Sequence, residues 1–253
     1  MTEPFLLVQL SDLHLGADWH GHDPVAAVEA AIRTIEDVRP RPAAVLVTGD
    51  LVENAADAEY ERARELLESL GGPLHVLPGN HDDRAALRRH FDVPGVGDEP
   101  VNYSVDLGPL RLVVVDTTLP GEDGGALDAG RLDWLDGELG AEPDAPTLLA
   151  MHHPPLVTGI KPLERIGLPP ADRRALAAVV ERHPQVHRLV AGHMHRAIAS
   201  SLAGRAVLAA PSTYLHARLD CISEDLQLAP DPPGFAVHVL VDGELASHVQ
   251  PVG

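Results

Sequence analysis

The chain has 253 residues, of which 45% are hydrophobic, and this is enough for one domain with a full core. Lys and Arg number 19 against 38 Asp and Glu, so the formal net charge of −19 repels polyanions and anionic lipid surfaces. Long nucleic acids and membranes are therefore excluded as main partners. A small phosphate ester can still bind, because a bound metal ion would outweigh the negative potential of the whole protein at its own site.

Short apolar runs alternate with longer segments that are rich in alanine and charge, which predicts an α/β sheet with flanking helices. The runs are FLLVQL (5–10), AAVLVTG (43–49), LHVLPG (74–79), TLLAMHH (147–153) and HRLVAGH (187–193). A first helix is predicted over 23–38, with Asp23 as N-cap and Pro24 in the first turn. A second is predicted from about Ala56 to Leu70, closed by two glycines, and two more over 129–140 and 171–183.

Two regions depart from this alternation and predict antiparallel hairpins. Segment 101–118 carries a central LGPL, and segment 234–250 carries Asp242-Gly243, a strong hairpin-turn signal. Together with the alternating part they predict a mixed sheet, or two sheets packed together. The sequence shows no internal repeat and no interdomain linker.

The compartment is indicated by the N-terminus and by cysteine usage. MTEPFLLVQLSDLH lacks a basic n-region and its apolar stretch is short, so it predicts neither a signal peptide nor a membrane span. The single cysteine, Cys221, rules out an intramolecular disulfide. We therefore expect a cytoplasmic protein.

All five apolar runs end in residues that bind metals or phosphates: SDLH, GD, GNHD, HH and GHMH. In open α/β sheets, ligands bind beyond the carboxyl ends of the strands, so we expect these scattered clusters to converge. Together they offer seven oxygen and imidazole ligands, which suit two metal ions that share one carboxylate. The seven candidates are Asp12, His14, Asp50, Asn80, His152, His193 and His195.

This mixture of carboxylate, amide and imidazole without cysteine favours manganese, iron, zinc or cobalt over a thiolate-held structural zinc. Iron with manganese, or two manganese ions, is our first choice. Two such ions roughly 3.5–4 Å apart can clamp both oxygens of an in-line phosphoryl displacement and generate hydroxide at neutral pH. The chemistry that this predicts is hydrolysis of a phosphate ester.

Each cluster also has a plain structural interpretation. GNHD can be an Asn-containing turn, SDLH a helix or turn cap, and HHPP a pair of surface histidines. The order of the motifs assigns no role to His153, which stays open. We favour a site because all five clusters occur in order and each follows a predicted strand.

The ordered set SDLH, GDL, GNHD, HHPP and GHMH resembles the calcineurin-like metallophosphoesterase superfamily over about residues 5–215. APSTYLHARLD and PPGFAVHVLVDGELASHV further resemble the branch of bacterial cyclic-nucleotide phosphodiesterases and glycerophosphodiesterases. The fold class that we expect is α/β, with two packed mixed β-sheets flanked by helices in a four-layer αββα sandwich. We expect one domain over 1–253, with 213–253 as a C-terminal loop and β-hairpin extension.

The resemblance also implies roles for individual residues. It places Asp12, His14 and His195 on one metal and Asn80, His152 and His193 on the other, with Asp50 bridging them. A metal-bound hydroxide would attack phosphorus. His81 would contact the ester and act as general acid or charge stabiliser, and Asp82 would orient His81. Gly192 would let the backbone turn close to the site.

Two further residues are candidates for substrate contact. Trp19 lies in GADWHGHDP, which follows the first ligand pair, and offers a stacking face for a base; the alternative is an ordinary exposed loop. His216 follows APST and is placed near the substrate by the resemblance. The segments 154–170 and 213–233 are expected to shape the pocket.

The predicted activity is that of a dinuclear-metal phosphodiesterase acting on small diesters, with 3',5'-cyclic nucleotides, cyclic AMP first, as substrates. The alternatives are a glycerophosphodiester phosphodiesterase, a broad phosphomonoesterase and phosphodiesterase, or, from a different class, a non-catalytic scaffold that has kept the fold. A scaffold would be expected to lack ligands, yet all seven are present. The expected partner is a small-molecule phosphodiester, and family analogy allows a homodimer.

Overall fold

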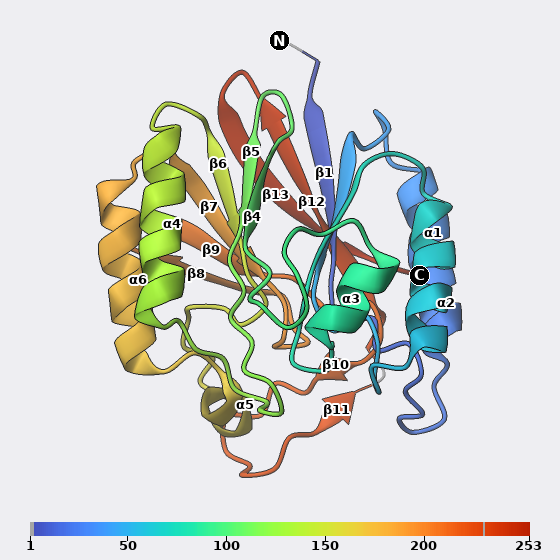
Figure 1. The fold of residues 1–253 in the computed structure, drawn as a ribbon. Helices are drawn as coiled ribbons and strands as arrows, with labels where there is room; N and C mark the ends of the chain where they lie inside the picture. The colour runs from blue at the N-terminus through green and yellow to red at the C-terminus, as the bar shows by residue number, and fades with distance from the viewer. Residues whose placement is uncertain (1–2, 230) are drawn as a thin grey trace.

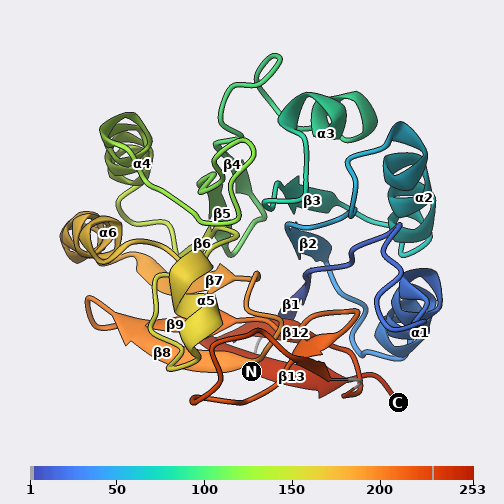
Figure 2. The same cartoon turned by 90° about the horizontal axis from the view of Figure 1, so that it is seen from below.

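The computed structural model describes residues 3–229 and 231–253 (Figure 1), so Met1, Thr2 and Pro230 lie outside the described part of the predicted domain 1–253 and of the predicted 213–233 loop. Two β-sheets pack against each other and helices cover the outer face of each. Figure 2 shows α1, α2 and α3 beside one sheet and α4 and α6 beside the other. The four-layer αββα sandwich expected from the sequence is confirmed.

The first sheet has the strand order β13-β12-β1-β2-β3, in which β1, β2 and β3 are parallel and β12 runs antiparallel to both β1 and β13. Its strands are β1 (Phe5–Leu10), β2 (Ala44–Thr48), β3 (Leu74–Leu77), β12 (Gly234–Val241) and β13 (Glu244–Pro251). The C-terminal hairpin is therefore part of this sheet, because β12 pairs directly with β1.

The second sheet has the order β4-β5-β6-β7-β9-β8 and is also mixed, with β5, β6, β7 and β9 parallel and one antiparallel strand at each edge. Its strands are β4 (Tyr103–Asp106), β5 (Arg111–Val114), β6 (Thr147–Ala150), β7 (Val186–Ala191), β8 (Ile198–Leu202) and β9 (Arg205–Ala209). A small separate pair, β10 (His216–Ala217) with β11 (Leu228–Ala229), lies outside both sheets.

The helices that the structure describes are α1 (Pro24–Glu36), α2 (Asp57–Glu68), α3 (Arg84–His90), α4 (Ala129–Ala141), α5 (Lys161–Ile166) and α6 (Pro170–Arg182). Of these, α1, α2, α4 and α6 agree with the predicted ranges to within two residues at each end. The Asp23 carboxylate accepts a hydrogen bond from Val25 N at 2.9 Å, which confirms the predicted cap. At the C-terminal hairpin, Asp242 and Gly243 both take the positive φ values that a type I′ turn requires.

Three apolar layers hold the sandwich together. One lies between the first sheet and α1–α3, another between the second sheet and α4–α6, and the third between the two sheets. In the third layer, Leu7 and Leu46 of the first sheet pack with Leu112 and Leu148 of the second, and all four are fully buried. Both sheets are therefore covered on two faces, which explains why their parallel strands read as continuous apolar runs.

One buried amide also joins the two sheets close to the strand ends. Gln9 of β1 donates from Nε2 to Thr48 Oγ1 of the same sheet and to the carbonyl of Ala191 in β7, both at 2.9 Å. Its Oε1 lies 3.0 Å from His238 Nε2. These bonds fix β1 and β7, the strands that precede SDLH and GHMH, relative to each other.

Several short elements were not predicted. These are α3, α5, the β8–β9 hairpin and the β10–β11 pair, all of seven residues or fewer per element. Segments of this length carry too few periodic positions to stand out from a loop, and tertiary contacts decide their structure. Among residues 3–229 and 231–253, no helix is long and apolar enough to cross a membrane.

Candidate metal centre

The seven predicted ligands follow the carboxyl ends of β1, β2, β3, β6 and β7. A first group brings ligand atoms of Asp12, His14, Asp50 and His195 within 4.8 Å of one another, and all four residues are buried. His14 Nε2 lies 3.0 Å from His195 Nε2 and 3.5 Å from Asp50 Oδ2. This spacing suits one cation.

A second group gathers around His152. Its Nε2 atom lies 3.1 Å from Asn80 Oδ1, 3.2 Å from His193 Nδ1 and 3.4 Å from Asp50 Oδ2. Asp50 Oδ2 therefore lies close to an imidazole of each group. The amide of Asn80 brings an oxygen to this group, as the sequence predicted.

Hydrogen bonds to the outer nitrogens show which atoms face each group. His195 Nδ1 donates to the carbonyl of Leu215 at 2.8 Å, and His14 Nδ1 lies 2.8 Å from Glu53 Oε2. The two Nε2 atoms thus face each other with lone pairs inward, at a distance that requires a proton or a cation between them. Because two carboxylates adjoin the same point, these residues fit a divalent metal ion.

The second group follows the same pattern. His152 Nδ1 donates to the carbonyl of Thr48 at 2.8 Å, and His193 Nε2 donates to the carbonyl of Ile166 at 2.9 Å. The remaining nitrogens of the two rings face each other at 3.2 Å, and that of His152 also lies near the oxygens of Asn80 and Asp50. Backbone carbonyls that hold the far side of a ligating imidazole are typical of metal sites.

The backbone at the candidate ligands is strained. Asp12, His14, Asp50, His193 and His195 all have positive φ, between 47° and 67°, although none is glycine. Such residues cost about 1 kcal/mol or more each and cluster at functional sites, where the surrounding structure holds them. The conformation turns successive side chains of SDLH and GHMH toward the same edge.

Glycines permit the close packing around these loops. A Cβ atom on Gly192 would lie 1.9 Å from Ser11 Oγ and 2.9 Å from the Thr48 carbonyl oxygen. The chain can therefore pass this close to Ser11 and Thr48 only at a residue without a side chain, which agrees with the expected role of Gly192. The adjacent His193 N–H donates to the Asp12 carboxylate, at 3.0 Å to Oδ1.

Burial and neighbouring charge determine the protonation of the buried histidines. Burial lowers the pKa of His195 to about 4, so this imidazole is neutral at pH 7 and can donate a lone pair. Burial also opposes the charge on His152, but the Asp50 carboxylate outweighs it and raises the pKa of His152 to about 9. A metal ion that binds His152 therefore displaces a proton.

His153, whose role the sequence leaves open, lies beside His152 and His193, close enough for its ligand atom to group with theirs. Its ring lies fully buried between Thr117 Oγ1, 2.8 Å from Nδ1, and the carbonyl of Asp123, 3.1 Å from Nε2. Both nitrogens are thereby engaged, and burial lowers the pKa of His153 to about 3. The ring packs against His193 with a centroid distance of 4.3 Å and so supports a candidate ligand.

The structure corrects the role predicted for Asp82. We expected its carboxylate to orient His81, but Oδ2 accepts from the backbone N–H of Gly79 at 2.8 Å and of Leu51 at 3.2 Å. Oδ1 accepts from Tyr60 Oη at 3.2 Å. Asp82 thus ties the GNHD loop to Leu51 and Tyr60 rather than orienting the ring of His81, because its donors are one N–H of the loop and two groups outside it.

Glu53, which was not among the predicted residues, contacts the His81 ring, as does the ring of His14 at a centroid distance of 4.8 Å. His81 Nδ1 lies 3.2 Å from the Glu53 carbonyl oxygen and 3.5 Å from its Oε2. The same carboxylate holds His14, so Glu53 connects the first group to His81. Burial opposes protonation of His81, but the charges of Asp50 and Glu53 raise its pKa.

A cavity of about 290 Å³ opens over both groups. Trp19 and His81 line it, and the Trp19 ring lies 4.5 Å from that of His14. Asp123 also lines it, and the remaining wall is largely apolar, formed by Leu163, Ile166, Ala217, Leu226 and Leu228. Trp19 therefore lies at the edge of the candidate site, and its contact with a substrate stays a prediction.

His216 is placed differently from the expectation. Its Nε2 atom lies 3.1 Å from the carbonyl oxygen of Ser212, and the neighbouring Ala217 forms the cavity wall instead. Because β10 alternates its side chains, only one of these two residues can face the cavity. The predicted substrate contact by His216 is not supported by this geometry.

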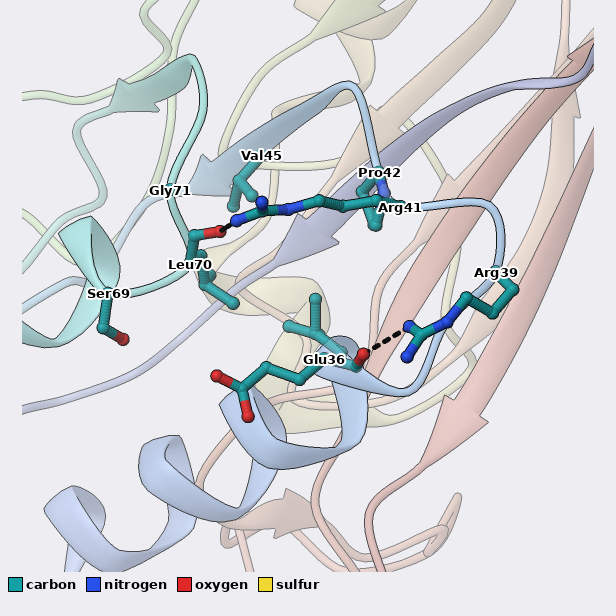
Figure 3. A pocket seen from close by; sticks show the side chains of 9 residues that line it. Glu36, Arg39, Arg41, Pro42, Val45, Ser69, Leu70 and Gly71 are labelled. Carbon is teal, nitrogen blue, oxygen red and sulfur yellow. Dashed lines mark hydrogen bonds between the residues drawn. The ribbon is translucent and has the colours of Figure 1, made fainter.

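A second cavity, of about 350 Å³, lies at the opposite end of β2 (Figure 3). Its two arginines are already engaged: Arg39 donates to the Glu36 carbonyl, and Arg41 donates to the Leu70 carbonyl at 2.7 Å. They cap the C-terminal ends of α1 and α2. We assign this cavity to the packing of helix ends rather than to the site.

Comparison with known proteins agrees with this geometry. The model of the calcineurin-like phosphoesterase family matches residues 5–197. The chain is 33% identical to a glycerophosphodiester phosphodiesterase of Enterobacter lignolyticus, over 96% of this chain and 90% of that protein. It is 31% identical to a 3',5'-cyclic adenosine monophosphate phosphodiesterase of Pseudomonas aeruginosa, over 94% and 83%.

A solved structure supports the fold independently. A dimetal phosphatase from Danio rerio superposes with a TM-score of 0.75 and covers 99% of this chain and 98% of that one. Sequence identity is only 15%, so this likeness bears on the arrangement of sheets and helices alone.

Proposed function

The chain belongs to the calcineurin-like phosphoesterase family, and from this premise we propose that it is a metal-dependent phosphodiesterase of small phosphodiesters, with 3',5'-cyclic AMP as first substrate. The main support for this proposal is that the lone pairs of the candidate ligands point toward one another. Acceptor atoms of seven side chains face two adjacent points, with Asp50 Oδ2 at 3.5 and 3.4 Å from an imidazole of each group. Such an arrangement needs protons or cations between the acceptor atoms, and two divalent metal ions would supply them.

We assign Asp12, His14 and His195 to one metal, Asn80, His152 and His193 to the other, and Asp50 to both. When bound, two such ions activate water and neutralise charge on the phosphate oxygens. Manganese with iron is the pair that we propose, because hard oxygen and imidazole donors are mixed without thiolate.

The chain's own residues supply the remaining steps. His81 is part-exposed at the cavity, and Glu53 holds its Nδ1, so Nε2 is the nitrogen left for the substrate. We assign to Nε2 the transfer of a proton to the leaving alkoxide, or the stabilisation of its charge. Asp82 acts indirectly, because its carboxylate ties the loop that carries Asn80 and His81 to Leu51.

The two relatives named above differ in substrate class, one acting on glycerophosphodiesters and the other on a cyclic nucleotide. The cavity wall of this chain favours the nucleotide. Leu163, Ile166, Leu226 and Leu228, with the ring of Trp19, form an apolar surface beside the metal groups. A purine base can pack on such a surface, whereas a glycerol group gains less from it. Glycerophosphodiesters remain the second candidate, since the phosphorus centre and charge are the same and a relative of comparable identity carries that name.

The test is a steady-state comparison of manganese-loaded protein on cyclic AMP, glycerophosphocholine and bis(p-nitrophenyl) phosphate. We expect the highest specificity constant for cyclic AMP. A preference for glycerophosphocholine would move the function to the second candidate, and absence of turnover on all three would support a scaffold. A cytoplasmic location and a homodimer stay predictions from the sequence.

A further inference from the structure

The apolar wall of the cavity is built from two segments far apart in the sequence. Leu163 and Ile166 belong to α5, and Leu226 and Leu228 to the segment 218–229, here named the outer loop. Figure 1 shows α5 and β10–β11 at the same end of the molecule, below the carboxyl ends of the strands. The wall is continuous only if these two segments stay together.

The base of the outer loop is fixed by short-range pairing. Ala217 pairs with Leu228 in the β10–β11 ladder, and Arg218 N donates to the Gln227 carbonyl at 2.7 Å. Beyond this base the loop extends into solvent, and Ile222 is 83% exposed. Its far end therefore needs another attachment.

Glu224 provides that attachment to α5. Its carboxylate accepts from Lys161 Nζ at 2.6 Å and from the Arg165 guanidinium, and Arg165 also donates to the Glu224 carbonyl at 2.9 Å. Lys161 and Arg165 are four residues apart and so lie on one face of α5. An isolated exposed ion pair contributes little, but two cations on one carboxylate and a backbone bond form a network.

The opposite side of α5 is anchored to the metal centre. The carbonyl of Ile166 accepts from His193 Nε2, and Glu164 holds the preceding turn through Thr158 Oγ1 at 2.7 Å and Gly159 N at 3.1 Å. Helix α5 is thus fixed independently of the outer loop. Loss of the Glu224 contacts would release the loop and leave α5 and His193 in place.

We propose that Glu224 is a positioning residue for substrate specificity: by binding Lys161 and Arg165 it holds Leu226 and Leu228 against α5, and the resulting wall selects diesters whose second ester group is apolar. This inference rests on the proposed phosphodiesterase function. The wall presents Asp123 and no Lys or Arg side chain among the described residues that line the cavity. A second anionic group is therefore disfavoured.

The experiment compares phenyl p-nitrophenyl phosphate with methyl p-nitrophenyl phosphate, which release the same leaving group and differ only in the second ester group. For the manganese-loaded wild type we expect the specificity constant to favour the phenyl ester by about tenfold, the scale of partly burying one ring. For Glu224→Gln we expect this preference to fall to about threefold or less, through a higher KM for the phenyl ester. The kcat for the methyl ester and the metal content should stay within about twofold.

Three controls isolate the contact. Glu65→Gln removes an exposed glutamate that pairs with Arg62 on α2 and should leave both esters unaffected. Glu224→Asp keeps the charge and should retain most of the preference. Because the pairs are exposed, about 1 M salt should weaken the preference of the wild type and leave that of Glu224→Gln unchanged.

Distinct results would overturn the inference. An undiminished phenyl preference in Glu224→Gln would show that the outer loop needs no contact with α5, and equal loss of kcat on both esters would place Glu224 at the reacting centre. A wild type without phenyl preference would remove the apolar wall as a selective element. A wild type inert toward both esters would instead refute the proposed function, and this inference with it.

Discussion

Alanine at Gly192 and at Gly137 should have opposite effects, although the added methyl group is the same. At Gly192 the new Cβ would lie 1.9 Å from Ser11 Oγ, 2.9 Å from the Thr48 carbonyl oxygen and 3.1 Å from Asp12 Oδ2, against the 3.4–4 Å of ordinary contact. At Gly137, inside α4, nothing lies within 4 Å.

The two substitutions should change the free energy of unfolding in opposite directions. Overpacking costs about 1–3 kcal/mol, and at Gly192 one obstacle is backbone that cannot swing away, so we expect a loss at the upper end of this range. The shift also separates His193 N from the Asp12 carboxylate, and displacement of about 1 Å can cost about 100-fold in rate. Gly137→Ala should gain about 0.5–1 kcal/mol, because alanine favours the helix.

Three measurements test these effects. Stability is measured by urea unfolding with and without manganese, metal binding by mass spectrometry, and rate by turnover of bis(p-nitrophenyl) phosphate. Gly192→Ala should be destabilised, contain less metal and turn over slowly, while Gly137→Ala should be more stable and fully active. If Gly192→Ala kept the wild-type metal content and rate, the loop would tolerate a side chain at residue 192, contrary to the contacts given above.

Other substitutions separate metal binding, catalysis and folding. Asn80→Ala should lower metal content and nearly abolish turnover, and unchanged metal content with full activity would remove Asn80 from the ligands. His81→Ala should keep its metal and lose about 100-fold or more in rate, and unchanged rates on an ester with a poor leaving group would retire its role. Arg84→Met leaves the buried Asp116 carboxylate without its 2.8 Å partner, so urea unfolding should show a loss of about 3–5 kcal/mol. A loss below about 1 kcal/mol would show that other donors suffice for Asp116.

The structure brings the seven predicted ligands together, and the sequence accounts for only part of this. Parallel strands end at one edge of their sheet, so the polar residues after β1, β2 and β3 gather at one edge and those after β6 and β7 at another. The packing of the two sheets, which the strand pattern does not specify in detail, brings these two edges together. The hairpins at 103–114 and 234–251 were also predictable, because their turn residues are local signals. Periodicity does not reveal the positive φ of Asp12 and His14. Asp and His adopt such a conformation more often than most residues other than glycine, but still only in a small fraction of cases, so residue type alone does not predict it.

Glu53 was missed because its role depends on pairing beyond the strands. Leu15 forms an isolated parallel bridge with Val52, and Glu53 N donates to the Leu15 carbonyl at 3.0 Å. These bonds bring Glu53 beside His14, although the two are 39 residues apart. Asp82 was misassigned for the related reason that adjacency to His81 in sequence does not set where a carboxylate points.

The crossed connections in the GHMH loop make the two halves of the centre interdependent. His193 presents its ring to the second group, yet its backbone N–H binds Asp12 of the first, and His195 returns from the same loop to the first group. A displacement of this one loop therefore moves candidate ligands of both groups. We expect a substitution that shifts the loop to lower metal content at both positions rather than at one, which metal analysis of the variant measures.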